Sequence, residues 1–372
     1  MKRVIIVEDD AVISHLHRVI VNQLGHEVVG CFDSGSEAVD FLKQNEADLI
    51  LMDVRLEDSS KDGIEVMKEI REFSSVPVVY ISGHANKDLY HRASDTDMVG
   101  FLTKPVDPNQ LDSLLVSVQD ISESLRYAKK VQDCIFPERK EIAEVFPHHA
   151  IINKPKHIVG GDIVYFRYIP REHRVIAGVL DCTGHGVPAA LLSVLAHETL
   201  NSCVDESTNI AQLLTNFNNK LHRRLMKSGD FGSHQSIDLV LSDIDLIHNK
   251  ISISGAHRPV VYFDSVKDEL VTYKFHALSL GGEEKEEKDF EVIERNFNRA
   301  DNVYFFSDGI TDQMGGAFDK KLKRSSLMEF LQRITHNQML QQEIEMNYFF
   351  YKWKGDFEQT DDVTIFALNF QR

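Results

Sequence analysis

The sequence has few cysteines, no excess of positive charge and no long hydrophobic segment. Its four cysteines are widely scattered among 372 residues, without the paired spacing of a zinc site or a disulfide framework. We therefore expect reduced thiols. The formal net charge of -17 argues against a nucleic-acid-binding surface, because such a surface needs a basic face to meet phosphates.

The start of the chain also lacks the pattern of a secretory signal. The first apolar run ends at Val7 and acidic residues follow at once, and no apolar stretch approaches the ~20 residues that span a bilayer. We therefore expect a cytoplasmic protein without a membrane segment. A chain of 372 residues is long for one hydrophobic core, so its length predicts two domains.

Polar side chains directly follow apolar runs in the first third of the chain. These side chains are Glu8, Asp9, Asp53, Ser82 and Lys104. The runs alternate with segments of helical periodicity, near residues 11–24, 35–45, 63–73 and 108–118, which is typical of a parallel sheet covered on both faces. Functional groups gather at the carboxyl ends of the strands in such an α/β, doubly wound sheet. The pattern therefore predicts a functional site at that edge.

Residues 1–120 resemble the receiver domain of response regulators. The resemblance implies that a cognate histidine kinase phosphorylates Asp53, and that Glu8, Asp9, Asp53 and the carbonyl of Arg55 hold Mg²⁺. An aspartate can accept a phosphoryl group when a metal and a lysine neutralise the phosphoryl oxygens, so the chemistry is consistent. By the same resemblance, the residues that respond to phosphorylation are Ser82, Phe101 and Lys104.

Four acidic motifs lie in the last two thirds of the chain. They are GGD at 160–162, DCTGHG at 181–186, SDG at 307–309 and DDVT at 361–364. Each lies next to a strand-like apolar run, where carboxylates are costly unless bound cations offset their charge. A site with only oxygen ligands favours Mg²⁺ or Mn²⁺ over zinc.

The order of these motifs resembles the metal-dependent, PPM-type serine/threonine protein phosphatases of the SpoIIE-like bacterial branch, over residues 146–370. The resemblance implies a phosphatase domain at 147–372, of α+β class, with an antiparallel β-sandwich flanked by helices. By the same resemblance, the ligands of two Mn²⁺ or Mg²⁺ ions are Asp162, Asp181, Asp308, Asp361 and the carbonyl of Cys182. Whether Asp361 or the adjacent Asp362 is the ligand stays open.

Three further side chains near these motifs have two interpretations each. Lys154 and Lys156 precede GGD, and either could meet a substrate phosphate as a point charge or be a solvated residue of an edge strand. His185 precedes an apolar helical run. It could donate a proton to the leaving serine oxygen, or it could stabilise the turn.

Between the two domains, at 121–146, we expect a helical linker with a repeating stripe. The spacing alternates between four and three residues, which keeps one face of a helix towards a partner. The stripe consists of Leu114, Val118, Ile121, Leu125, Ala128, Gln132 and Ile135. It predicts either a dimerising coiled coil or a helix that packs back on its own domain. Related phosphatases often carry a dimerising helix here, so the resemblance implies a homodimer.

The two resemblances together imply a two-component response regulator whose output is a protein serine/threonine phosphatase. The implied substrate is a phosphorylated STAS-domain anti-sigma antagonist in a partner-switching pathway. The alternative is a non-enzymatic adaptor, in which the phosphatase fold is a protein-binding platform gated by the receiver. Retention of all four acidic motifs argues against the adaptor. The residues do not decide whether phosphorylation activates or inhibits.

Overall fold

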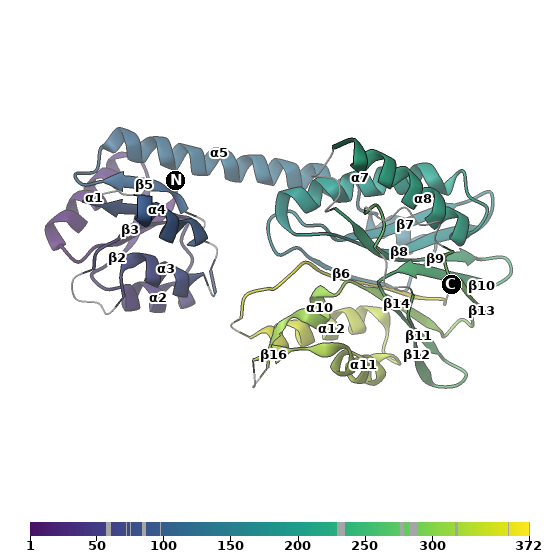
Figure 1. Cartoon of the computed structure of the whole chain (residues 1–372). Coiled ribbons are helices and arrows are strands. Elements are labelled where there is room, and N and C mark those ends of the chain that lie inside the picture. Colours follow the sequence, from purple (N-terminus) through teal and green to yellow (C-terminus); the bar gives the residue numbers. More distant parts are fainter. Residues whose placement is uncertain are drawn as a thin grey trace. The chain divides into compact units, whose positions relative to one another are not determined.

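The computed structural model divides the chain into two compact units, Met1–Ser124 and Leu125–Gly355 with Gln359–Arg372. It describes residues 1–56, 61–71, 73–74, 76–83, 87–96, 98–228, 235–275, 279–282, 289–316, 319–355 and 357–371. One long helix, α5 (Pro108–Asp133), begins in the first unit and ends in the second. Figure 1 shows the elements of both units.

The first unit is a five-stranded parallel sheet in the order β2-β1-β3-β4-β5. Its strands are β1 (Arg3–Val7), β2 (Glu27–Phe32), β3 (Leu49–Asp53), β4 (Val78–Ser82) and β5 (Met98–Thr103). Besides α5, its helices are α1 (Ala11–Gln23), α2 (Gly35–Gln44), α3 (Gly63–Ile70), α4 (Lys87–Ala93) and the short 3₁₀ helix η1 (Ser94–Thr96). This confirms the predicted doubly wound receiver architecture, with α4 added to the predicted helices.

Strand β1 explains why the predicted strands are apolar at successive positions. Ile5 and Val7 pack into a core with α2 and α3, whereas Val4 and Ile6 pack into a core with α1 and α5. Successive side chains of a strand point to opposite faces, so a strand covered on both faces is apolar throughout. Polar groups are then left to the strand ends, where the predicted site residues lie.

The second unit contains two five-stranded antiparallel sheets, in the orders β13-β10-β9-β8-β7 and β12-β11-β14-β17-β6. The strands of the first of these sheets are β7 (Ile163–Ile169), β8 (Arg174–Cys182), β9 (Ile237–Asp245), β10 (Lys250–Ala256) and β13 (Ile293–Asn296). Those of the second are β6 (His149–Lys154), β11 (Val260–Asp264), β12 (Glu269–Tyr273), β14 (Asn302–Phe306) and β17 (Val363–Asn369). A small separate pair consists of β15 (Met314–Gly315) and β16 (Lys320–Lys321).

Helices cover the outer faces of this sandwich, as Figure 1 shows. One core lies between the sheets, where Val179 and Val240 pack with Phe305 and Phe366. The other helices are α6 (Arg139–Ala143), α7 (Gly186–Val204), α8 (Ile210–Leu225), η2 (Met226–Ser228), α10 (Gly309–Asp312), α11 (Lys323–Ile334) and α12 (Met339–Lys354). The pair α7 and α8 packs on one sheet, and α11 and α12 pack on the other. The predicted antiparallel β-sandwich flanked by helices is thus confirmed.

Helix α7 corrects the expectation that no segment is long and apolar enough to span a bilayer. By length and composition alone, its 19 residues pass that test. Half of its most apolar window is buried, and Leu192, Ala196 and Leu200 pack into the core against the sheet. Core helices of globular domains pass the same test, so α7 is weak evidence for a membrane segment.

The predicted stripe on α5 packs at both of its ends. Leu114 and Val118 contribute to the core of the first unit, whereas Gln132 is buried within the second. Leu125 and Ala128, between these ends, are half-buried. The side chain of Ile121 lies outside the described residues. Among the described side chains of the stripe, Leu125 and Ala128 are thus the two that pack into neither core.

Candidate functional site

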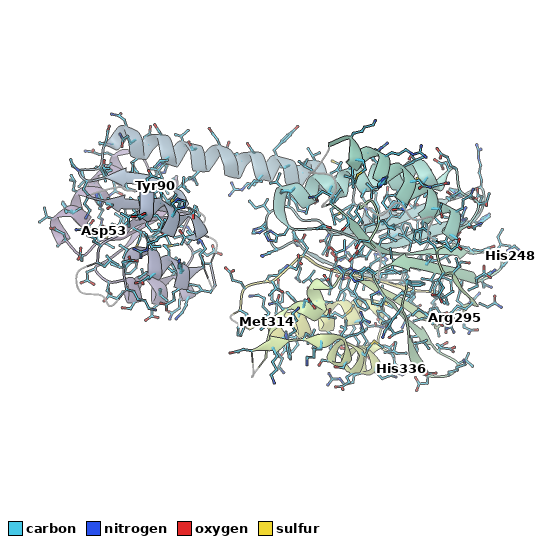
Figure 2. All side chains as sticks on the ribbon, viewed as in Figure 1. Asp53, Tyr90, His248, Arg295, Met314 and His336 are labelled. Carbon is cyan, nitrogen blue, oxygen red and sulfur yellow. The ribbon has the colours of Figure 1, made fainter. Side chains whose placement is uncertain are left out.

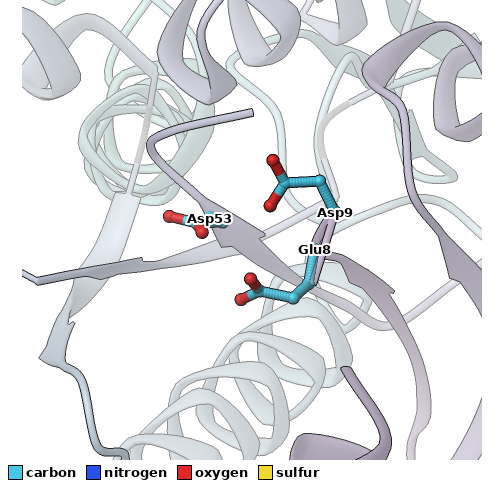
Figure 3. Close-up of side chains that lie close together, drawn as sticks. All are labelled: Glu8, Asp9 and Asp53. Atoms are coloured by element: carbon cyan, nitrogen blue, oxygen red, sulfur yellow. The ribbon is translucent and has the colours of Figure 1, made fainter. Parts of the chain in front are cut away.

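The predicted receiver residues meet at the carboxyl ends of the strands. Carboxylate oxygens of Glu8, Asp9 and Asp53 lie within 4.8 Å of one another, and Figure 3 shows these three side chains together. Lys104 Nζ donates hydrogen bonds to Glu8 Oε1 at 2.7 Å and to Asp53 Oδ2 at 2.5 Å. The backbone N–H of Arg55 donates to Asp53 Oδ1 at 3.0 Å. Asp53 therefore lies between a cationic side chain and two other acids.

The electrostatics of this cluster suit a divalent cation. Burial raises the pKa of Glu8 to about 7, and the charge of Asp53 adds to the rise, although the hydrogen bond from Lys104 opposes it. Glu8 Oε2 is buried and has no hydrogen-bond partner among the described residues. Hard cations such as Mg²⁺ take oxygen ligands, so Glu8, Asp9 and Asp53 fit the ion that the receiver resemblance implies.

The residues predicted to respond to phosphorylation lie on the neighbouring strands. Ser82 is buried at the end of β4, and Phe101 lies on β5. The Phe101 ring is 5.2 Å from the Tyr80 ring and 4.5 Å from the Tyr90 ring. Tyr90 is labelled with Asp53 in Figure 2 and is 45% exposed, so the aromatic contact extends from the sheet to the surface.

In the second unit, the GGD motif forms a tight turn before β7. A Cβ atom on Gly161 would lie 2.8 Å from the carbonyl oxygen of Cys182, so glycine permits this close approach. The approach brings the carbonyl of Cys182 next to the turn that carries Asp162. Asp162 is buried, and its Oδ2 has no hydrogen-bond partner among the residues that the structure describes. An orphaned buried carboxylate oxygen is costly unless a cation binds it.

The four motif aspartates lie close enough to influence one another. Burial raises the pKa of Asp181 to about 8; Arg258 lowers it, and Asp308 and Asp361 raise it further. Burial and then the charge of Asp181 raise the pKa of Asp162 well above its usual range. Aspartates that are far apart in the sequence thus influence one another's charge, and their carboxylate oxygens are ligands of the kind that Mn²⁺ or Mg²⁺ takes.

The adjacent aspartates of DDVT have different surroundings. The carboxylate of Asp362 accepts hydrogen bonds from the backbone N–H of Gly161 at 2.5 Å and of Lys156 at 2.7 Å. Asp362 is buried and ties the GGD turn to β17. Asp361 is half-buried, and burial and the charge of Asp308 raise its pKa. Backbone N–H groups therefore bond both carboxylate oxygens of Asp362, whereas Asp361 interacts with the motif aspartate Asp308.

A guanidinium that the sequence reasoning did not single out lies among these carboxylates. Arg258 contacts Asp181 Oδ2 at 3.0 Å, Asp238 Oδ2 at 2.9 Å and Asp308 Oδ2 at 2.5 Å. Asp238 was also missed. It lies on β9 directly opposite Asp181 on β8. The sequence feature that could have identified Asp238 is its position as the one acid within the apolar run 237–241.

The remaining candidates lie around this centre. Lys154 Nζ donates to Tyr351 Oη at 3.0 Å and lies 4.4 Å from the centre of the Tyr351 ring. The backbone N–H of Lys156 donates to the carboxylate of Asp362, as described above. His185 Nδ1 lies 3.1 Å from His157 Nε2, directly before α7. The structure thus places the side chain of Lys154 against α12, and pairs His185 with a second histidine.

Gln132, a member of the predicted stripe, packs against its own unit, which is one of the two interpretations that the stripe left open. Its Nε2 donates to the carbonyl of Gly160 at 2.5 Å and to Ser193 Oγ at 3.0 Å, and its Oε1 accepts from Gly160 N at 3.4 Å. The side chain therefore binds groups of the second unit, to which this part of α5 belongs. These bonds join the end of α5 to the turn that carries Asp162.

We expect Gln132→Leu to lower the free energy of unfolding by about 1–3 kcal/mol, because it leaves buried groups of Gly160 and Ser193 without their partner. Urea unfolding followed by circular dichroism measures this loss. The matched control is Gln110→Leu, the same substitution at an exposed position of α5, which should change stability by less than about 0.5 kcal/mol. Equal effects of the two substitutions would contradict the structural role of Gln132.

Known proteins resemble both parts of the chain. The family model of the response regulator receiver domain matches residues 4–116, and that of Stage II sporulation protein E (SpoIIE) matches residues 171–371. Transcriptional regulatory protein PdtaR of Mycobacterium tuberculosis is 33% identical over 110 residues, which cover 30% of this chain and 53% of PdtaR. The chain thus spans about half the length of that relative.

Two further proteins are similar over a larger part of the chain. Phosphoserine phosphatase RsbU of Bacillus subtilis is 22% identical over 253 residues, covering 67% of this chain and 71% of RsbU. The solved SiaA-PP2C domain of Pseudomonas aeruginosa has a TM-score of 0.60 and 25% sequence identity, and the match covers 68% of this chain and 98% of that domain. The SpoIIE match alone covers more than half of the chain. This chain belongs to the SpoIIE family and joins a response regulator receiver domain to a PP2C-type phosphatase domain.

Proposed function

We propose that this protein is a metal-dependent protein serine/threonine phosphatase whose activity is controlled by phosphorylation of Asp53. The observation that carries the proposal is the convergence of Asp162, Asp181, Asp308 and Asp361, together with the orphaned Oδ2 of Asp162. A non-enzymatic adaptor would have no use for the unpaired carboxylate oxygen of the buried Asp162, which destabilises a fold unless a cation binds it. The acidic centre therefore favours the enzyme.

The chemistry divides between the metals and the chain. Two Mn²⁺ or Mg²⁺ ions, held by the four aspartates and the carbonyl of Cys182, would supply a water that is nucleophilic at neutral pH. Asp362 holds the GGD turn in place through backbone N–H groups. The guanidinium of Arg258 has a planar fork of donors that suits phosphoryl oxygens. His185, paired with His157, is the proposed donor of a proton to the leaving serine oxygen.

The proposed substrate is a phosphoserine or phosphothreonine of a STAS-domain protein in a partner-switching pathway. The similarity to RsbU, which is a phosphoserine phosphatase, supports the phosphoserine part of this proposal. The receiver domain supports a histidine kinase as the upstream partner, since Asp53 lies beside Lys104 and the acid pair. Phosphorylation is proposed to activate the phosphatase.

Hydrolysis of p-nitrophenyl phosphate and of a phosphoserine protein tests the proposal. Turnover of both is expected with Mn²⁺ or Mg²⁺ and should stop when a chelator is added, because the buried carboxylates then lose their cations. Circular dichroism before and after chelation controls for unfolding. A folded protein that hydrolyses neither substrate with either metal would favour the adaptor.

We further propose a homodimer through the exposed middle of α5. Leu125 and Ala128 are half-buried there, and the nearby Tyr127 and Val131 are 70% and 49% exposed. Apolar side chains of this size are stabilised when a partner removes them from water. A helix that pairs in this way offers a route for a change in the receiver to reach the GGD turn, because Gln132 in the last turn of that helix bonds Gly160.

Leu125→Asp is therefore expected to shift the protein from dimer to monomer and to reduce its activation by beryllofluoride. Mass in solution and turnover of a phosphoserine substrate, each with and without beryllofluoride, measure the two effects. The control is Ser124→Asp, which adds the same charge at an exposed neighbour. If Leu125→Asp changes neither the mass nor the response, α5 does not mediate the coupling.

A further inference from the structure

A basic hollow lies beside the acidic centre of the phosphatase unit. Its volume is about 640 Å³, and Met314, labelled in Figure 2, contributes to its wall. The basic residues of its lining are Lys274, Lys320, Lys321, Lys323 and Arg324. Asp312, which pairs with Lys321 at 2.7 Å, is the only acidic residue of that lining among the described residues. The hollow is therefore strongly basic, although the chain as a whole has a net charge of -17.

The hollow lies one helical turn from a predicted metal ligand. Thr311 and Asp312 line it, and the backbone N–H of each donates to the carbonyl of Asp308 at 2.8 Å. One turn of an α-helix rises about 5.4 Å. In an extended peptide, successive residues are about 3.3–3.6 Å apart. A residue two or three positions from a bound phosphoserine would thus reach the hollow.

Arg324 in this lining has no anionic partner among the described residues. No hydrogen bond or ion pair joins its side chain to another described residue, and its Nε is buried without an acceptor. Burial lowers the pKa of Arg324, and the positive charge of Arg258 lowers it further. A guanidinium with these surroundings is unfavourable by itself and gains from any carboxylate or phosphate that enters.

We propose that this hollow binds acidic residues that flank the phosphorylated side chain of a protein substrate, with Arg324 pairing with one of their carboxylates. The inference rests on the proposed phosphatase function and names the class of substrate that the enzyme prefers. An acidic segment is repelled by most of this acidic chain and attracted at the hollow, so the charge pattern also directs the segment towards the catalytic carboxylates.

Two phosphoserine peptides of equal length test the preference. One carries glutamate two and three residues to either side of the phosphoserine, and the other carries glutamine there. With Mn²⁺, the wild type is expected to show a kcat/KM about fivefold higher for the acidic peptide, the range of one partly exposed ion pair. In Arg324→Gln this ratio should fall towards one, whereas Arg324→Lys should keep part of it.

The matched control is Lys352→Gln, which removes the same charge from α12 at a position outside the lining of the hollow. It should keep the ratio of the wild type. The proposal is overturned if the wild type does not distinguish the peptides, or if Arg324→Gln keeps the full ratio. An equal fall in kcat/KM for both peptides in Arg324→Gln would also overturn the proposal, since Arg324 would then bind the phosphoryl group itself.

A binding measurement separates this inference from the proposed catalysis. Fluorescence anisotropy of a labelled, unphosphorylated glutamate peptide needs neither metal nor turnover. Binding to the wild type is expected to weaken with salt and to weaken about fivefold in Arg324→Gln, with Lys320→Gln as a second variant should the first fail to fold. If the glutamate peptide binds but no phosphoserine substrate is hydrolysed, the proposed phosphatase function is rejected and the proposed binding role of the hollow is kept. If phosphoserine substrates are hydrolysed but the glutamate peptide does not bind, only the proposed binding role of the hollow is rejected.

Discussion

Replacing Asp181 with asparagine is expected to reduce phosphatase turnover by several orders of magnitude and to leave the fold intact. Asp181 is the last residue but one of strand β8 and interacts with other motif aspartates, so its loss would remove a ligand that the proposed metal ions share. Without metal activation, the pKa of the attacking water returns from about 7 towards ~15.7. Turnover of p-nitrophenyl phosphate with Mn²⁺ and the melting temperature measure the two effects.

Asp268→Asn is the control for this change, because it removes an equal charge from an exposed turn between β11 and β12. It should keep the turnover of the wild type. Manganese-dependent hydrolysis of a phosphoserine protein by Asp181→Asn would contradict the assignment of Asp181 as a ligand. Loss of the fold in both variants would show that the assay reports stability instead of chemistry.

The second large effect concerns the receiver unit. Acetyl phosphate in the presence of Mg²⁺ is expected to phosphorylate the wild type, and labelling should disappear completely in Asp53→Ala. Lys104 Nζ and the backbone N–H of Arg55 both donate to the carboxylate of Asp53, which supports Asp53 as the proposed nucleophile. Retention of radioactive phosphate on the protein measures the reaction.

Asp33→Ala serves as the control for labelling, since Asp33 is an exposed acid that follows β2. It should be labelled as fully as the wild type. Removal of Mg²⁺ by a chelator should abolish labelling in both proteins, because Glu8 and Asp9 then hold no cation to neutralise the phosphoryl oxygens. Labelling that survives in Asp53→Ala would place the phosphoacceptor at another side chain.

Much of the fold could be predicted from the sequence because the evidence for it is local. A strand buried on both faces must be apolar at successive positions, so the runs before Glu8 and Asp53 predicted a covered parallel sheet. The motif aspartates were also visible, because an acid at the end of such a run is costly without a cation. Both features can be predicted without knowing which residues become neighbours in the folded protein.

The tertiary structure decided the features that depend on contacts between distant residues. The pairing of β8 with β9 places Asp238 opposite Asp181, and Arg258 joins both to Asp308. No pattern along the chain encodes that meeting. The different surroundings of Asp361 and Asp362 arise in the same way, because the GGD turn that bonds Asp362 lies 201 residues earlier.

Gln132 illustrates the limit of helical periodicity. The four-and-three spacing correctly identified one face of α5, but periodicity describes which side chains share a face and not what covers it. The partners of Gln132 are Gly160 and Ser193, which lie 28 and 61 residues away in the sequence. The sequence by itself thus determined the two folds and the acids that lie at the ends of their apolar runs. Only the packing of α5 and of the two sheets decided which groups surround those acids, because the partners come from segments that no local pattern connects.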